Sequence, residues 1–223
     1  MTYTGYLQLL FRQGDKAYAA FSQPLSNSSL TVIGVRVPIL RQLIKTHCTD
    51  TDLRLSNFEL GKYLEVDFSY FALGLLRCKN TAEQLNFLSA NLSYAQSWII
   101  TDMLNSYLKK ATFEDFWSFF LAHHCDKHVY TRRFAYVFGL KFYRDQRILQ
   151  VLPYLKSDNT YMVNMGQAWL LATVAIAYPD AVYNFLVTAS AELKTKTISK
   201  IRDSFRINEK IKSRFVALRN QNK

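Results

Sequence analysis

The chain has 223 residues, of which 49% are hydrophobic and 20% charged, and its net charge is +11. This length suffices for one large or two small domains with a full core, and the apolar content excludes a disordered chain. No apolar run approaches the roughly 18–20 residues of a membrane span. The N-terminus lacks the basic start, apolar core and small-residue cleavage site of a signal peptide, so we expect none. Three widely spaced cysteines indicate reduced intracellular thiols rather than a disulfide framework.

The positive charge is concentrated at the C-terminal end. Residues 194–223 hold ten Lys and Arg against Asp203 and Glu209, so this segment carries +8 of the net charge. Such a concentration favours a polyanionic partner, with nucleic acid ahead of an anionic membrane. A pair of basic helices that merely face solvent explains the same charge equally well.

The spacing of apolar residues predicts helices along the whole chain. Spacings of three and four dominate, glycine is scarce, and alternating β-branched runs are absent. Residues 23–31 are expected to form a loop because they are rich in Pro, Asn and Ser, and Pro38 suits the first turn of the helix that follows. The other expected helices span residues 3–12, 15–22, 57–64, 67–79, 81–90, 96–109, 112–124, 127–143, 145–153, 160–177, 179–188, 196–204 and 207–219.

Short polar joints between these helices predict antiparallel pairs. About a dozen helices of this length fit an all-α fold, a degenerate α-solenoid in which each pair buries its face against the next. No linker or compositional break divides the chain, so we expect a single domain over residues 1–223.

A W-x-x-x-D pattern stands out in the helix expected at 96–109. Trp98, Asp102 and Lys109 fall on the face opposite an apolar stripe that includes Ile100 and Leu104. A tryptophan there is poorly placed for the helix's own core. Two interpretations are open: the indole packs on a neighbouring helix and Asp102 is solvated, or the pair belongs to a site.

Two further residues attract attention in the second half. Arg133 projects into the apolar stripe of its helix, and a buried guanidinium needs a partner, for which an ordinary structural acid, Asp102 and a bound phosphate are all open. Its neighbour Arg132 is predicted to face solvent. Trp169 lies in an apolar helix and is, by periodicity, more typical of a core than of a site.

Other catalytic motifs find no support. His123, His124, Cys125 and His128 cluster, but they straddle an expected helix junction and lack an HExxH glutamate, so we expect a structural or surface role and no metal. The sequence contains no P-loop, GxGxxG or GxSxG pattern, which disfavours nucleotide binding and serine hydrolysis. No cofactor is expected.

Four segments, GVRVPILRQLIK, SWIITDML, YTRRFAYVFGL and YMVNMGQAWLLATVAIAYP, occur in a characteristic order. With them the chain resembles the DNA alkylation repair enzymes built of HEAT-like repeats, the AlkD family of DNA glycosylases, from about Gly34 to Phe215. The resemblance is closest to a subgroup of short bacterial members. It implies an α-α superhelix of about six antiparallel HEAT-like helix pairs, with a concave basic face that clasps duplex DNA.

The resemblance also implies residue roles. The family's catalytic carboxylate lies four residues after a tryptophan, which corresponds to Asp102 and Trp98; its central arginine corresponds to Arg133 and its second site tryptophan to Trp169. The implied reaction is excision of cationic N3- or N7-alkylpurines from alkylated duplex DNA by a monomeric cytoplasmic protein, associated with the bacterial nucleoid when bound to DNA. The candidates for contacts with the DNA backbone are Arg36, Arg41, Lys45, Lys109, Lys200, Arg202 and Arg206.

Two positions differ from the family pattern. Leu25 stands where active members carry a tyrosine, and Ala172 where they carry a DNA-contacting arginine. Loss of both contacts is expected to weaken DNA binding. The alternatives to a glycosylase are therefore a catalytically silent relative that binds nucleic acid through its basic face, and a scaffold for an acidic protein.

Overall fold

The structure, a computed structural model, describes residues 1–220 and is helical almost throughout. Within these residues, β structure is limited to one isolated parallel bridge between Thr31 and Tyr63. The predicted all-α class, with packed neighbouring helices, is therefore confirmed. No helix in this part of the chain combines the length and apolar character needed to cross a membrane.

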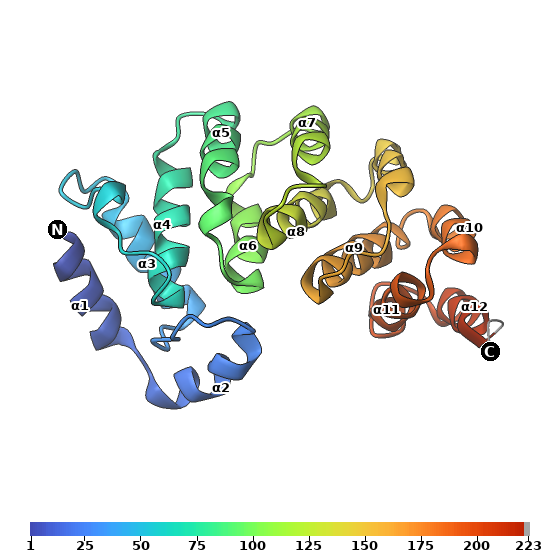
Figure 1. The fold of residues 1–223 in the computed structure, drawn as a ribbon, viewed down its shortest axis with the longest axis horizontal. Helices are drawn as coiled ribbons and strands as arrows, with labels where there is room; N and C mark the ends of the chain where they lie inside the picture. Colours follow the sequence, from blue (N-terminus) through green and yellow to red (C-terminus); the bar gives the residue numbers. More distant parts are fainter. Residues whose placement is uncertain (221–223) are drawn as a thin grey trace. The chain divides into compact units, whose positions relative to one another are not determined.

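Short connecting segments join most of the successive helices (Figure 1). The α-helices are α1 (Tyr3–Gln13), α2 (Lys16–Ser26), α3 (Val37–His47), α4 (Leu64–Arg77), α5 (Thr81–Asn91), α6 (Trp98–Leu104), α7 (Phe113–His123), α8 (Val129–Phe138), α9 (Tyr161–Val174), α10 (Pro179–Thr188), α11 (Ala191–Arg202) and α12 (Glu209–Asn220). Short 3₁₀ helices are η1 (Leu55–Asn57), η2 (Leu92–Tyr94), η3 (Asn105–Tyr107), η4 (Gly139–Phe142) and η5 (Gln146–Tyr154).

The chain divides into two compact units, Met1–Ala111 and Thr112–Lys223. In unit 1, α4 is the central helix and packs against α3, α5 and α6. Its sequence, LEVDFSYFALGLLR, is apolar nearly all round, as expected of a helix covered on all sides. The fully buried Tyr6 of α1 donates a hydrogen bond to Ser69 Oγ (3.0 Å), which ties α1 to this central helix.

In unit 2, α9 takes the central place and packs against α8 and α11, while α7 packs on α8 (Figure 1). Phe116 and Phe120 of α7 and Phe134 and Phe138 of α8 are fully buried. The rings of Phe116 and Phe138 meet edge to face with centroids 5.6 Å apart. This packing of aromatic edges on faces gives unit 2 a core of its own.

Three sequence predictions differ from the structure. The helix expected at 57–64 is wrong: Gly61 has φ +88°, and Thr31 and Tyr63 form the bridge. The predicted loop at 23–31 starts too early, because α2 continues past Pro24 to Ser26 and ends where Asn27 turns left-handed (φ 46°). Residues 146–154 form a 3₁₀ helix rather than an α-helix, with Pro153 inside it.

Candidate functional site

The W-x-x-x-D pattern lies at the start of α6 in unit 1. Ser97 is the N-cap of this helix, and its buried hydroxyl donates to the Ser26 carbonyl oxygen (3.1 Å). The next residue, Trp98, donates its indole Nε1–H to the Leu25 carbonyl oxygen (3.1 Å). These two bonds attach the beginning of α6 to the end of α2. The Trp98 indole therefore contacts a neighbouring helix, α2, as one of the two interpretations expects.

Trp98 and Asp102 also line a cavity of about 260 Å³ in unit 1. Its walls are apolar and come from α2, α3, α4, α6 and the loop before α3, with Phe21, Val35 and Met103 among them. Asp102 and Trp98 are both half-buried, and they lie one helical turn apart. An indole and a carboxylate on the wall of an apolar cavity form an arrangement that attracts a ligand with a positive charge.

The loop behind this cavity is held by a buried carboxylate. Glu65, in the first turn of α4 and 3% exposed, accepts hydrogen bonds from the backbone N–H groups of Ile33 (2.9 Å), Gly34 (2.7 Å) and Val35 (3.1 Å). Gly34 has φ +96°, and a Cβ there would lie 2.2 Å from the Asp15 carbonyl oxygen. Only glycine fits this turn without displacing the backbone. The carboxylate and the glycine together fix the wall that contains Val35.

In unit 2, Arg133 is buried as predicted, with 5% of its surface exposed. Its Nη1 donates to the Met162 carbonyl oxygen of α9 (2.6 Å), and its side chain crosses the surface of α9 at Gly166. Trp169, one turn further along α9, is half-buried rather than in the core. Arg133 and Trp169 are therefore presented by two packed helices of the same unit.

The structure brings Trp98 and Asp102 together in unit 1, and it places Arg133 and Trp169 on adjoining helices in unit 2. That all four side chains belong to one site stays a prediction. Asp102 and Arg133 each have interactions within the protein, so neither is an isolated charge.

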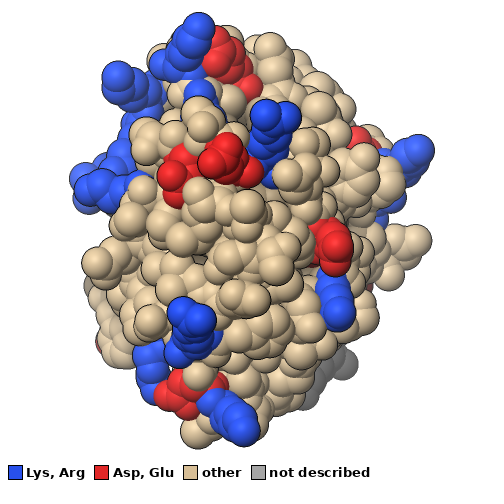
Figure 2. Space-filling model, turned by 90° about the vertical axis from the view of Figure 1, so that its left-hand side faces the viewer, with Lys and Arg blue, Asp and Glu red and all other residues tan. Residues whose placement is uncertain are grey.

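The predicted backbone-binding residues of unit 1 are exposed. Arg41 and Lys45 lie one turn apart on α3, and Arg41 Nη2 contacts Ser106 Oγ (3.4 Å), three residues before Lys109. Arg36 instead forms an ion pair with Asp15 (3.2 Å) and lies over the Tyr18 ring (4.8 Å from the centroid). The side of the molecule seen in Figure 2 carries Lys and Arg next to Asp and Glu, around a broad uncharged area.

The basic segment of unit 2 is partly paired within itself. Arg202 is exposed and contacts Asp203 (3.2 Å), Arg206 lies over the Tyr143 ring (5.4 Å), and Lys200 is half-buried. Residues 221–223 of the predicted basic segment lie outside the described residues. A continuous basic face remains a prediction, because several of these cations have acidic or aromatic neighbours.

The prediction that Arg132 faces solvent is wrong. Its side chain is 13% exposed, and its Nε and Nη2 bind both carboxylate oxygens of Asp158 (2.9 and 3.1 Å). Its Nη1 donates to the carbonyl oxygens of Asp126 (2.7 Å) and Lys127 (3.1 Å). Sequence reasoning also missed Glu65. The hydrogen-bond partners of Arg132 and Glu65 lie 26 or more residues away or in an irregular loop, and helical periodicity does not indicate such contacts. For Glu65, the one sequence signal was an acid inside the apolar run of α4.

The His–Cys cluster behaves as a packing element. The ring of His124 stacks on Phe120 (5.0 Å) and contacts Tyr154 edge to face, and Cys125 Sγ lies 3.1 Å from His124 Nδ1. Burial, followed by the charge of Lys156, lowers the pKa of His124. Among residues 1–220, no three His, Cys, Asp or Glu side chains are grouped closely enough to hold a metal ion.

A family model described as DNA alkylation repair enzyme matches residues 7–202. The chain belongs to this family. The match covers most of both units, including the start of α6, the α8–α9 pair and the loop held by Glu65. Membership in the DNA alkylation repair family supports a role in DNA alkylation repair and suggests DNA as the substrate. A comparison with curated proteins gave no significant match.

Proposed function

We propose that this family member excises cationic N3- or N7-alkylpurines from duplex DNA by hydrolysis of the N-glycosidic bond. The observation that carries the proposal is the pair Trp98 and Asp102 on the wall of the unit 1 cavity, in a chain of the DNA alkylation repair family. The proposal needs units 1 and 2 to form one domain over residues 1–223. It involves no metal or cofactor.

The chemistry asks little of the protein beyond electrostatics and positioning. An alkylated purine already carries a positive charge, so the C1′–N bond breaks with its electron pair moving onto the base, which leaves neutral. The sugar becomes oxocarbenium-like, and Asp102 stabilises that charge and orients the water that attacks C1′. The proton released by the water passes to Asp102 or to solvent.

The other predicted residues serve binding. Trp98 and Trp169 present ring faces to the cationic sugar, and Arg133 holds a neighbouring phosphate. Sequence-independent phosphate contacts come from Arg36, Arg41, Lys45, Lys109, Lys200, Arg202 and Arg206. Such contacts make affinity fall steeply as salt rises, and specificity then comes from the charge of the lesion rather than from base edges. The protein acts as a cytoplasmic monomer.

A second candidate is a catalytically silent relative that binds nucleic acid. It is favoured by the bond between the Trp98 indole and the Leu25 carbonyl, because this bond gives Trp98 a structural role at a position next to α2. Leu25 itself is 54% exposed, and Ala172 is 5% exposed, so neither supplies the tyrosine or arginine contact of active members. This candidate predicts salt-sensitive DNA binding that Asp102→Asn leaves unchanged.

The experiment that separates the two is release of free base from methylated duplex DNA. We expect wild type to release 7-methylguanine or 3-methyladenine above the spontaneous rate, and Asp102→Asn to reduce the rate by about 100-fold or more. Asp52→Asn, at an exposed acid of unit 1 outside the cavity, is the matched control and should retain full activity. No release above the spontaneous rate, together with intact DNA binding, would favour the silent relative.

A further inference from the structure

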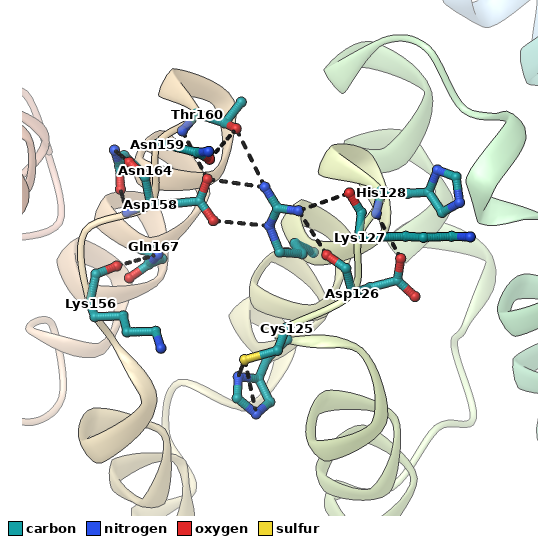
Figure 3. A network of polar contacts seen from close by, with 12 residues as sticks. Cys125, Asp126, Lys127, His128, Lys156, Asp158, Asn159, Thr160, Asn164 and Gln167 are labelled. Atoms are coloured by element: carbon teal, nitrogen blue, oxygen red, sulfur yellow. Dashed lines mark hydrogen bonds and ion pairs between the residues drawn. The ribbon is translucent and has the colours of Figure 1, made fainter.

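Unit 2 contains a polar pocket of about 500 Å³ that the proposed reaction does not use. Two irregular segments form its sides: residues 124–128, which lead into α8, and residues 156–160, which lead into α9 (Figure 3). Arg132 and Tyr136 of α8 and Gln167 of α9 complete its lining. Its volume lies within the range of small-molecule sites, about 300–1,000 Å³.

The two sides of this pocket are held together by Arg132, whose N–H groups all form hydrogen bonds within the protein. Arg132 joins the two sides, since it binds the Asp126 and Lys127 carbonyl oxygens on one side and Asp158 on the other. Its remaining N–H reaches Thr160 Oγ1 (3.4 Å), so each of its five donors has a partner. Asp158 also accepts from the Thr160 N–H (2.8 Å). Neither Arg132 nor Asp158 is available to a ligand, but together they fix the walls.

One acceptor in the lining has no partner. Gln167 is 1% exposed, and its Nε2 donates to the Lys156 carbonyl oxygen (2.9 Å). Its Oε1 is buried and forms no hydrogen bond within residues 1–220. Rotating the amide would set its oxygen against the Lys156 carbonyl, so the observed orientation is fixed. A buried acceptor without a donor is costly, and a ligand that brings an O–H or N–H removes that cost.

Two cations flank the same pocket. Lys127 and Lys156 are exposed, and neither belongs to an ion pair in the described part of the chain. Lys156 lies close enough to His124 to contribute to the lowered pKa of that ring. The acids nearby are engaged: Asp126 accepts from the His128 N–H (2.8 Å), and Asp158 pairs with Arg132. The excess charge at the pocket is therefore positive and calls for an anion.

The remaining groups add donors. Burial raises the pKa of Tyr136, with Cys125 and Asp158 acting in the same direction and Arg132 opposing them, so the phenol stays protonated at neutral pH. Cys125 places its thiol against His124. The pocket thus offers two ammonium groups and a phenol O–H for an anion, and one carboxamide oxygen that requires a donor from the ligand.

We propose that this pocket of unit 2 binds a phosphomonoester, with its anionic oxygens on Lys127 and Lys156 and its P–OH donated to Gln167 Oε1. A phosphomonoester has a second pKa of about 6, so around that pH a substantial fraction is the monoanion, which carries negative charge and still supplies an O–H. A phosphodiester and a carboxylate have no such proton there. The pocket consequently selects the terminal phosphate of a DNA strand, or that of a free nucleotide, over the internal phosphates of a duplex.

This inference goes beyond the proposed excision reaction, because it rests on unit 2 residues alone and is measured without base release. The probes are a nicked duplex with a 5′-phosphate at the nick, the same duplex with a 5′-hydroxyl, and free deoxyadenosine monophosphate. We expect the full-length chain to bind the phosphorylated nick about tenfold more tightly than the hydroxyl nick. If the free nucleotide competes with the phosphorylated nick at matching affinity, the phosphate alone is sufficient for binding to the pocket. If it does not compete, the pocket binds the phosphate at a DNA strand end.

Variants test the chemistry of the pocket. Gln167→Met removes the acceptor at similar size and should reduce the preference for phosphate over hydroxyl. The double variant Lys127→Ala, Lys156→Ala removes both ammonium groups and should abolish it, whereas Lys79→Ala, at an exposed lysine of unit 1, should leave the preference intact. An unchanged preference in both pocket variants, or equal affinity of wild type for the two nicks, overturns the proposal.

The pH dependence gives a second test that does not depend on a variant that folds poorly. Lowering the pH from about 8 to about 6 increases the fraction of monoprotonated phosphate, so the preference of wild type should rise. Gln167→Met has no acceptor for the P–OH, so its preference should rise less over the same pH range. A wild-type preference that falls or stays constant as pH decreases contradicts the proposal.

Discussion

The two units stabilise their loops with opposite charges, and their pockets differ accordingly. In unit 1, the carboxylate of Glu65 collects three backbone N–H groups, and the adjoining cavity is apolar apart from a few side chains such as Asp102 and Trp98. In unit 2, the guanidinium of Arg132 collects two carbonyl oxygens and pairs with Asp158, and the adjoining pocket is polar.

This difference separates the kinds of ligand the units suit. The backbone N–H groups of the unit 1 loop already donate hydrogen bonds to Glu65. The cavity therefore offers a ligand apolar surface, the Trp98 indole and the Asp102 carboxylate, which favour a cation. In unit 2, Arg132 already binds the carbonyl oxygens of Asp126 and Lys127 and the carboxylate of Asp158. The positive charges of Lys127 and Lys156 are then in excess, which favours an anion. The excision proposed above, of a cationic base from a polyanionic polymer, calls for both kinds of surface.

The largest expected effect comes from removing the unit 1 carboxylate. Glu65→Ala leaves three buried N–H groups without an acceptor, and we expect the free energy of unfolding to fall by about 5 kcal/mol. Denaturant unfolding of the full chain measures it. Glu65→Gln, which keeps one acceptor oxygen, should cost clearly less; equal losses in the two variants would mean that packing rather than hydrogen bonding holds the loop.

The corresponding change in unit 2 is Asp158→Ala, which leaves a largely buried guanidinium without its acid. We expect a loss of about 4 kcal/mol in the same unfolding measurement. The double variant Arg132→Met, Asp158→Ala removes both charges and should be less destabilised than Asp158→Ala alone. A double variant that is worse by the sum of the two single losses would show that the ion pair is not the source of the effect.

A smaller effect, of opposite sign, is expected at Asp67 of unit 1. This carboxyl is fully buried, and burial raises its pKa from 3.8 to about 6 although the Gly61 N–H bond opposes the shift. Between these two pKa values the folded protein retains a proton that the unfolded chain has released, so the free energy of unfolding falls as pH rises through this window.

Asp67→Asn should therefore stabilise the protein by up to about 3 kcal/mol at pH 7 and by little below pH 3.8. Thermal unfolding of both proteins across this pH range gives the comparison. A stability difference that is independent of pH would contradict the assigned cause.

The smallest effect concerns the link between α2 and α6. Trp98→Phe removes the indole bond to the Leu25 carbonyl and should cost about 1 kcal/mol of stability. Trp117→Phe in unit 2 is the matched control, because Trp117 donates no hydrogen bond within residues 1–220. If Trp98 also presents its ring face to the substrate, the phenylalanine retains part of that contact, and base release should fall less than in Asp102→Asn.

Sequence patterns located most helices because the apolar stripes of α3, α7 and α10 repeat at helical spacing over three turns. They failed at 57–64, because the bridge to Thr31 depends on a segment some thirty residues away and Gly61 is left-handed. They also ended α2 too early, at residue 22, because the loop was predicted to begin just before Pro24. The actual end is set by Asn27 and by Ser26, whose hydroxyl donates to the Gln23 carbonyl.

The candidate site was predictable only in part. Trp98 and Asp102 were found because one helix carries both, and the burial of Arg133 followed from its apolar neighbours. The apolar walls around Trp98 come from α2, α3, α4 and the loop before α3, and no local pattern indicates that Phe21 and Val35 line the same cavity. Likewise, the role of Arg132 depends on Asp158, which periodicity does not connect to it.

The central claim is that Asp102 performs chemistry on the sugar of an alkylated nucleotide, and single-turnover release of 7-methylguanine from methylated duplex DNA tests it most directly. With protein in excess over DNA, we predict that wild type and Asp52→Asn release base at the same rate, and that Asp102→Asn binds the DNA with similar affinity but releases base about 100-fold or more slowly. Equal rates for wild type and Asp102→Asn would contradict this account.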